Sequence, residues 1–188
     1  MGAVLIPLLL GFASDSASAF TAAYSRRWGV RRGQWVTFVL RNVLGIPLWV
    51  IGLGLAVHYA SPMLFAASTL LKVIGWVLLV AGGIVQVLAL ASLRGRAAKP
   101  SITDALVERG VYGQIRHPIY AGLLLQFTAI ILVKPSYMVV LACVLGILWA
   151  LLQARLEEVD LLQRMPAYRE YLARVPRFVP RLRSHRSG

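Results

Sequence analysis

Five apolar stretches dominate the hydrophobic pattern of the chain, and each is nearly free of charged residues. They cover about 3–23, 43–60, 73–93, 119–133 and 137–154. A helix that crosses a bilayer upright needs about 20 apolar residues, so four of the five stretches approach the length of a full span. The fourth has only 15 residues, which leaves open whether it crosses the whole bilayer. The pattern predicts an all-α integral membrane protein with about five transmembrane helices.

A tight turn, Lys134-Pro135-Ser136, separates the last two stretches. We therefore expect these two helices to form a hairpin, with the start of one beside the end of the other. The chain also divides in two. Residues 1–93 form a three-helix transmembrane region, and residues 94–188 hold a cytoplasmic loop, the hairpin and an amphipathic C-terminal tail. Six of the seven acidic residues lie in the second part, so we expect the polar chemistry there.

The composition agrees with a membrane protein. Hydrophobic residues make up 59% of the 188 residues and charged residues 14%, against about 25% charged in soluble domains. These values exclude a disordered chain and argue against a soluble globule. A single cysteine, Cys143, excludes a disulfide within the chain. Asp15 lies inside the first apolar stretch, where a carboxylate is costly, and the sequence offers no reason for it.

The net charge of +13 predicts a topology. Eighteen of the 20 Lys and Arg residues, among them Arg96, Lys99, Arg183 and Arg186, fall in the two long loops and the tail. Cytoplasmic loops carry the excess of basic residues, so we expect the N-terminus outside and the C-terminus in the cytoplasm. The charge indicates a lipid bilayer as partner, not a nucleic acid. No basic residue precedes the first stretch, which favours an uncleaved span over a signal peptide.

Chemistry-bearing residues are densest between 106 and 122. Pro118 suits the first turn of a helix, which places Arg116 and His117 at a helix N-terminus, where an anion such as a ligand carboxylate binds well. Tyr120 offers an aromatic face that attracts cations. The structural alternative is that these are a membrane anchor, a helix start and an interfacial aromatic residue.

A second cluster, Arg155-Leu-Glu157-Glu158, follows the fifth stretch directly. Two adjacent carboxylates at a helix end repel each other and oppose the helix dipole, so a positive group is expected nearby. Arg155 is three residues from Glu158 and can face it on a helix. The hairpin brings Glu157 and Glu158 beside Arg116 and His117, a combination that suits a zwitterionic amino-acid moiety. The alternative is a solvated helix end neutralised by arginines. No metal-site motif is present.

Taken together, these motifs resemble the isoprenylcysteine carboxyl methyltransferase family, within a wider group that includes phospholipid N-methyltransferases. The resemblance covers about 104–180 and rests on Leu106-Val107, Gly110-Val-Tyr112, Arg116-His117-Pro118-Ile-Tyr120-Ala-Gly122, Arg155-Leu-Glu157-Glu158, Tyr168-Arg-Glu-Tyr171 and Arg174-Val-Pro176-Arg-Phe178-Val-Pro180. Met165-Pro166-Ala167 departs from the pattern of the relatives.

The resemblance implies an integral membrane methyltransferase that uses S-adenosyl-L-methionine. It also implies that the cofactor pocket lies on the cytoplasmic side, where the hairpin of the last two helices and the tail close it. The carboxylate pair, Glu158 above all, would hold the methionine ammonium, and Arg155 would act beside the methyl acceptor as the catalytic residue. The residues expected to bind the cofactor are Leu106, Val107, Tyr112, Arg116, His117, Pro118, Ile119, Tyr120, Glu157 and Glu158.

The acceptor is expected to be lipid-like or small and amphipathic. A carboxylate acceptor needs no general base, whereas an amine or thiol must lose a proton, and the sequence does not choose among them. Two other functions stay open: an NADPH-dependent membrane reductase of the sterol type, which carries a comparable Arg-His-Pro-x-Tyr segment, and a non-catalytic membrane protein that retains the hairpin.

Overall fold

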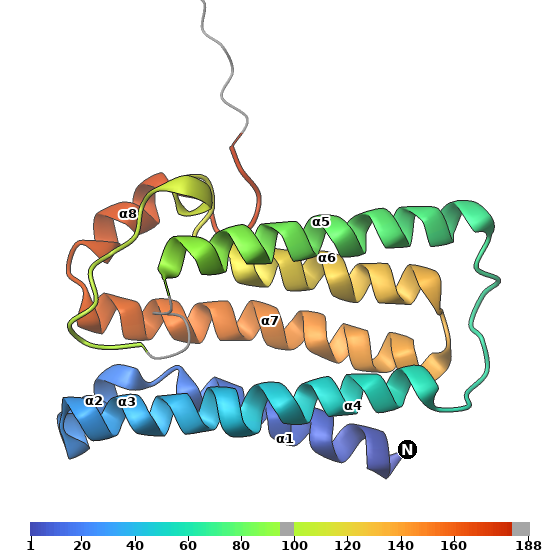
Figure 1. The fold of residues 1–188 in the computed structure, drawn as a ribbon, viewed down its shortest axis with the longest axis horizontal. Helices are drawn as coiled ribbons and strands as arrows, with labels where there is room; N and C mark the ends of the chain where they lie inside the picture. The colour runs from blue at the N-terminus through green and yellow to red at the C-terminus, as the bar shows by residue number, and fades with distance from the viewer. Residues whose placement is uncertain (95–99, 182–188) are drawn as a thin grey trace, which may run out of the picture.

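The computed structural model describes residues 1–94 and 100–181 as a bundle of helices (Figure 1). Its longest helices are α1 (Gly2–Ser18), α4 (Ile46–His58), α5 (Thr69–Leu93), α6 (Pro118–Val133) and α7 (Tyr137–Arg164). The shorter ones are α2 (Thr21–Trp28), α3 (Val30–Phe38), the π-helix η1 (Val39–Gly45), the 3₁₀-helix η2 (Gly110–Gly113) and α8 (Tyr168–Arg174). The described ranges contain no strand beyond one isolated bridge between Met63 and Ser136, so the all-α prediction is confirmed. Arg96, Lys99, Arg183 and Arg186, which entered the topology prediction, lie outside these ranges.

Within the described ranges, three helices are long and apolar enough to cross a membrane: Val30–His58, Thr69–Leu93 and Tyr137–Arg164. The first of these joins α3, η1 and α4 and starts well before the predicted stretch at 43. The predicted first span is not one straight helix, because α1 and α2 meet at a bend of 63° and count as a fourth span only if taken as a pair. Helix α6 has 16 residues and is short for a span.

The break after α1 follows from local hydrogen bonds. Ser18 Oγ donates to the carbonyl of Asp15 at 2.6 Å, and Tyr24 Oη donates to the carbonyl of Ala17 at 2.8 Å. These bonds satisfy carbonyl groups that the end of a helix leaves without partners. The chain can therefore bend between α1 and α2 without leaving the carbonyl groups of Asp15 and Ala17 unpaired.

Glycines let the helices approach closely. A Cβ added to Gly82 of α5 would lie 2.6 Å from the carbonyl oxygen of Gly122 in α6, and a Cβ added to Gly122 would lie 2.6 Å from that of Gly82. In the same way a Cβ on Gly52 of α4 would lie 2.6 Å from the backbone nitrogen of Leu8 in α1. Small residues at helix crossings are typical of membrane bundles, where close van der Waals contact drives association. Two tight pairs, α1–α4 and α5–α6, result.

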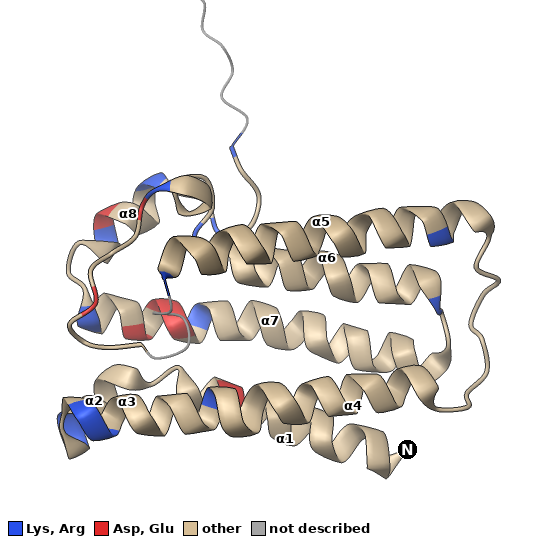
Figure 2. Ribbon diagram, viewed as in Figure 1, with Lys and Arg blue, Asp and Glu red and all other residues tan. Residues whose placement is uncertain are grey.

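Charged and apolar surfaces are separated along the bundle. In the described part of the chain, the acidic residues and most basic residues lie toward one end of the long helices (Figure 2). Lys72, in the first turn of α5, and Lys134, directly after α6, lie at the opposite end. Between the ends, large apolar side chains of α5 are exposed, among them Val73, Trp76, Val77, Val80, Ile84, Val87 and Leu88. An exposed apolar belt of this size needs a lipid environment. The chain is a multi-pass membrane protein with one strongly charged end.

The C-terminal segment packs onto the start of α6. The backbone N–H groups of Arg116 and His117 donate to the carbonyls of Pro176 (2.9 Å) and Arg177 (3.1 Å). The Arg116 guanidinium also donates to the carbonyls of Leu172 (2.5 Å) and Val175 (2.8 Å). Residues 175–177, directly after α8, are therefore part of the charged end of the bundle.

Candidate functional site

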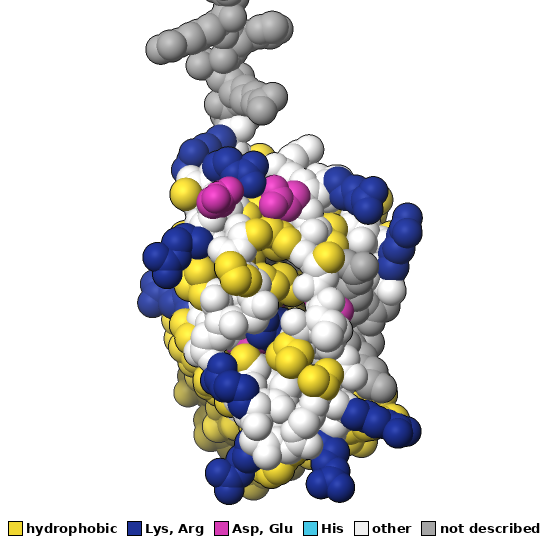
Figure 3. All heavy atoms as spheres, turned by 90° about the vertical axis from the view of Figure 1, so that its left-hand side faces the viewer, with side chains coloured by type: hydrophobic (Ala, Val, Ile, Leu, Met, Phe, Trp, Pro, Cys, Tyr) yellow, Lys and Arg dark blue, Asp and Glu magenta, His cyan; other side chains and the backbone are white. Residues whose placement is uncertain are grey.

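A cavity of about 570 Å³ opens within the charged end, a size typical of pockets for small ligands. Figure 3 looks onto this end, where Lys and Arg side chains stand around the edge and hydrophobic side chains gather inside the ring. The walls of the cavity come from α1, η1, α4, α5, α6, α7, α8 and the segment before η2. Eight residues predicted from the sequence line it: Leu106, Val107, Tyr112, Arg116, His117, Ile119, Tyr120 and Glu157.

Negative charge is concentrated at this cavity. Four of the seven acidic residues of the chain line it, namely Asp15, Asp104, Glu157 and Asp160. The basic residues among its walls are Arg41, Arg116 and Arg164. In a chain with a net charge of +13, this gathering of carboxylates favours a ligand that carries positive charge together with polar groups.

Glu157 is the carboxylate of the predicted pair that faces the cavity. Its Oε1 accepts a hydrogen bond from Tyr120 Oη at 2.6 Å and an ion-pair hydrogen bond from Arg41 Nη2 at 2.5 Å. Charge-assisted hydrogen bonds of this kind are short and strong. They hold the Glu157 side chain in one orientation at the cavity wall.

Glu158 is turned away from the cavity lining and is buried. Its Oε1 accepts from Arg116 Nε (3.1 Å), His117 Nε2 (3.1 Å) and Arg177 Nε (3.1 Å), and its Oε2 accepts from Arg177 Nη2 (2.5 Å). These bonds to the carboxylate raise the pKa of Arg177. The anion that Arg116 and His117 hold in this structure is thus the Glu158 carboxylate, which binds α6, α7 and the C-terminal segment together.

Arg155 and Pro118 do not line the cavity either. Pro118 is buried at the first turn of α6, as its residue type predicts. The Arg155 side chain is exposed, and the ion pairs described for Glu158 are with Arg116, His117 and Arg177 instead. The three-residue spacing between Arg155 and Glu158 allowed an ion pair on one helix face, but the structure pairs Glu158 with the other three residues.

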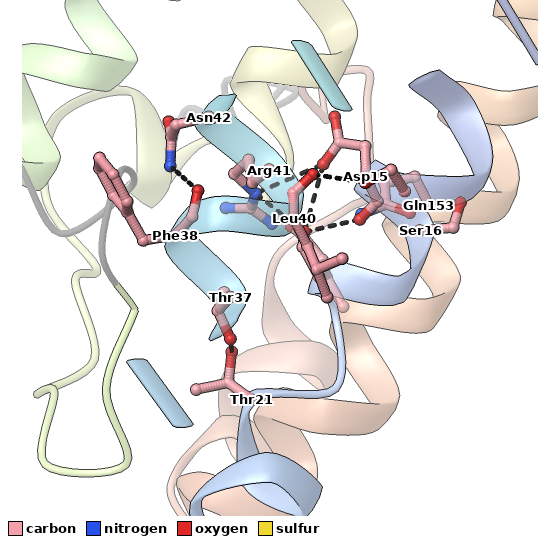
Figure 4. A network of polar contacts seen from close by, with 12 residues as sticks. Asp15, Ser16, Thr21, Thr37, Phe38, Leu40, Arg41, Asn42 and Gln153 are labelled. Atoms are coloured by element: carbon pink, nitrogen blue, oxygen red, sulfur yellow. Dashed lines mark hydrogen bonds and ion pairs between the residues drawn. The ribbon is translucent and has the colours of Figure 1, made fainter. Parts of the chain in front are cut away.

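The sequence did not predict the pairing of Asp15 with Arg41 at this site. Asp15 of α1 is 5% exposed, and its Oδ1 lies 3.5 Å from Arg41 Nε. Ser18 Oγ lies between them, 3.3 Å from Asp15 Oδ1 and 3.2 Å from Arg41 Nε. Figure 4 shows Arg41 on η1 directed at Asp15 on α1. The only sequence signal was a charge at residue 15 inside an apolar stretch.

A second ion-pair network, formed by Asp104, Asp160 and Arg164, also lies in the cavity wall. Asp160 accepts from the N–H of Ala22 (2.7 Å) and from Arg164 Nε (2.5 Å). Arg164 Nη1 also donates to the carbonyl of Ser101 at 2.5 Å, and Ser101 N–H donates to Asp104 at 2.7 Å. These bonds fix the segment that leads to Leu106 against α2 and α7.

Aromatic side chains form two parts of the wall. Near the surface, Tyr171 Oη donates to the carbonyl of Tyr112 at 2.6 Å, and burial raises the pKa of Tyr171 to about 12, so this phenol is neutral at physiological pH. Deeper in the bundle, Trp149 lies with its ring centre 5.9 Å from that of Trp49 and 6.2 Å from that of Tyr120. The cavity thus has an amphipathic outer part and an aromatic inner part.

Comparison with known families gives one match. The family model of phospholipid methyltransferase matches residues 70–168, which include η2, α6, α7 and all of α5 except its first residue. No curated protein and no solved structure matches the chain. The matched region contains Glu157 and Tyr120 but neither Asp15 nor Arg41.

Proposed function

The chain belongs to the phospholipid methyltransferase family, and from this membership we propose that it transfers a methyl group from S-adenosylmethionine to the headgroup amine of a membrane lipid. The family makes it a membrane methyltransferase that acts on lipids. The identity of the methyl donor and the choice of an amine as acceptor are what we propose in addition. The narrower resemblance to isoprenylcysteine carboxyl methyltransferases, with a carboxylate acceptor, is less well supported because the family match is to the phospholipid enzymes.

The observation that carries the proposal is the acidic cavity at the basic end of the bundle. S-adenosylmethionine combines an ammonium, a carboxylate, a sulfonium and an adenosine. Glu157, fixed by Arg41 and Tyr120, is placed to hold the ammonium. Arg116 and His117, which border the cavity and are oriented by Glu158, would face the carboxylate.

The outer wall of the cavity suits an adenosine. Leu106, Val107 and Ile119 offer apolar contacts there, and Tyr112 adds an aromatic face. When bound, S-adenosylmethionine supplies a methyl group on an electrophilic sulfonium, so the chain needs no metal and no covalent enzyme intermediate. The contribution of the protein is to hold the acceptor and the donor in line, which is worth up to about 7–11 kcal/mol.

We propose that the lipid reaches the cavity from the bilayer, between α4 and α5. Ile46 and Trp49 line the cavity on one side, and Gln86, Leu90 and Leu93 line it on the other. Each of these two helices packs closely against a different neighbour, α4 against α1 and α5 against α6, and not against the other. A headgroup can enter here while its acyl chains stay in the membrane.

The proposed topology has five spans, with α6 as a short fourth crossing and the charged end in the cytoplasm. The separation of charge in Figure 2 supports it. Arg155 is exposed at this end of α7, and we assign it to the anionic phosphate of the lipid headgroup. It would then orient the acceptor from the surface of the site.

Binding of S-adenosylmethionine to the purified protein, measured by calorimetry, tests the donor. Glu157→Gln removes one charge-assisted contact to the ammonium, which is worth about 1.5–3 kcal/mol, so affinity should fall roughly 10- to 150-fold. Glu170→Gln removes an exposed carboxylate of α8 and should leave affinity unchanged. Wild-type protein that binds NADPH instead would point to the reductase, and binding of neither would point to a non-catalytic protein.

A further inference from the structure

Asp15 is a buried carboxylate at the cavity whose charge the surrounding residues do not balance. The charged groups that face it are Arg41 of η1 and Glu157 of α7, while α4 presents the uncharged Trp49. Arg41 lies closer to Glu157 (2.5 Å) than to Asp15 (3.5 Å). Two carboxylates thus share one guanidinium, and with both carboxylates ionised the three groups have a formal charge of −1.

The backbone beside Asp15 has an unusual form. Arg41 and Asn42 lie on η1, a seven-residue π-helix within the long helix from Val30 to His58. π-helical segments are rare and occur frequently at functional sites. A Cβ on Gly45, the last residue of η1, would lie 2.8 Å from Asp15 Cβ, so the glycine allows α1 to come this close. The π-helix places Arg41 and Asn42 on the cavity wall with Asp15.

The aromatic inner wall adds a second preference for a cation. Trp49, Trp149 and Tyr120 line the same cavity as Asp15 and Glu157. Aromatic faces attract cations, and several faces around one position are used to recognise alkylated ammonium groups. Carboxylates next to such a wall form a site for an amine that gains methyl groups and keeps its charge.

We propose that Asp15 binds the ammonium of the acceptor lipid and accepts its proton before the methyl group is transferred. This inference rests on the proposed function. An ammonium nitrogen has no free electron pair, so one N–H proton must first pass to the Asp15 carboxylate, which becomes a carboxylic acid. The freed pair then forms the N–CH₃ bond as the C–S bond breaks and the sulfur keeps the bonding electrons. General bases of this kind contribute about 10²- to 10⁴-fold.

Asp15→Asn tests the proposal in two independent measurements with wild-type protein and a Glu170→Gln control. The first is binding of dodecylphosphoethanolamine, followed by calorimetry below its critical micelle concentration. Loss of the charge-assisted contact should weaken this binding roughly 10- to 150-fold, while affinity for S-adenosylmethionine stays within about threefold. The control should match the wild type in both measurements.

The second measurement is the rate of phosphatidylethanolamine methylation as a function of pH. Wild-type turnover should be nearly flat above the pH at which Asp15 ionises. The Asp15→Asn rate should be at least about 100-fold lower near neutral pH and should rise about tenfold per pH unit as the solvent deprotonates the amine. Asp15→Glu, which restores a carboxylate, should recover part of the rate and the flat profile.

Three results would overturn the proposal. Asp15→Asn could bind the amphiphile as the wild type does, it could lose rate by one constant factor at every pH, or the wild-type protein could bind S-adenosylmethionine but methylate no amine. The last result would leave the donor site standing and remove only the role of Asp15. Failure of the wild-type protein to bind S-adenosylmethionine would remove both proposals.

Discussion

Glu158 accepts hydrogen bonds from three side chains, and its loss should loosen the charged end before it affects the ligand directly. The carboxylate is buried and accepts from Arg116, His117 and Arg177. Breaking a buried ion pair costs about 3–5 kcal/mol, and the partial exposure of Arg177 places Glu158→Gln at the lower end. We expect a lower thermal midpoint in detergent and faster proteolysis between residues 175 and 181.

The same substitution at Glu170 provides the comparison, because that carboxylate is exposed on α8. Its thermal midpoint and proteolysis rate should equal those of the wild type. If Glu158→Gln keeps the wild-type midpoint but loses S-adenosylmethionine affinity as strongly as Glu157→Gln, then Glu158 contacts the ligand, as the family resemblance implied, and our assignment of the two carboxylates is reversed.

Among individual site residues, the sequence predicted those that lie in recognisable motifs. It did not predict those that are far apart in the sequence and are brought together by the tertiary structure. Tyr120 and Glu157 follow from recognisable segments on either side of a short turn, and both line the cavity. Asp15 and Arg41 are 26 residues apart and meet only because of the bend after α1 and the π-helix η1. Neither feature has a local sequence signal, so the pair could not be predicted.

Among the helices, the α5–α6 crossing depends on the absence of a side chain at Gly122. Gly122→Ala should force the helices apart, because the new Cβ would lie 2.6 Å from the carbonyl oxygen of Gly82 and from Gln86 Cγ. Overpacking of this kind costs about 1–3 kcal/mol, which should lower the thermal midpoint in detergent and the yield of folded protein.

Gly54→Ala is the matched control for this prediction. A Cβ at Gly54 of α4 would have no atom within 4 Å, and alanine is favoured over glycine inside a helix by roughly 0.5–1 kcal/mol. The control should therefore be neutral or slightly stabilising. Equal midpoints for the two variants would show that α5 and α6 do not cross at Gly82 and Gly122 in the membrane.

Helix boundaries could be predicted only where the sequence marks them. Pro118 and the turn at 134–136 fix the start of α6 and the connection to α7. The helix that ends at His58 begins at Val30, whereas the apolar stretch predicted from the sequence begins at 43. The prediction missed the first half of this helix because that half carries Arg31, Arg32 and Arg41 and is not apolar. A helix that continues beyond the hydrocarbon core of the membrane keeps its backbone hydrogen bonds. Its residues there are polar, so the hydrophobic pattern of the sequence does not reveal that part of the helix.

For the whole molecule, the charge separation predicts orientation in the membrane. We expect a reporter after Gly188 to be cytoplasmic and one placed between α4 and α5 to be external, since Lys72 and Lys134 are the only Lys or Arg residues of the described ranges at that end. Glycosylation or fluorescence reporters at both positions make the measurement. A cytoplasmic reading between α4 and α5, or an external C-terminus, would place the cavity away from the cytosolic methyl donor and contradict the proposed function.

The docking of residues 172–177 on the start of α6 has a consequence for biosynthesis. The backbone N–H groups of Arg116 and His117, and Nη1 of Arg116, donate to carbonyls of this segment, which the ribosome makes about 60 residues after them. All the long helices can be inserted before these partners exist. A growing chain therefore passes through a stage in which it is already anchored in the bilayer but has an unfinished ligand pocket, and the translocation machinery handles a protein that is not yet competent to bind its substrates.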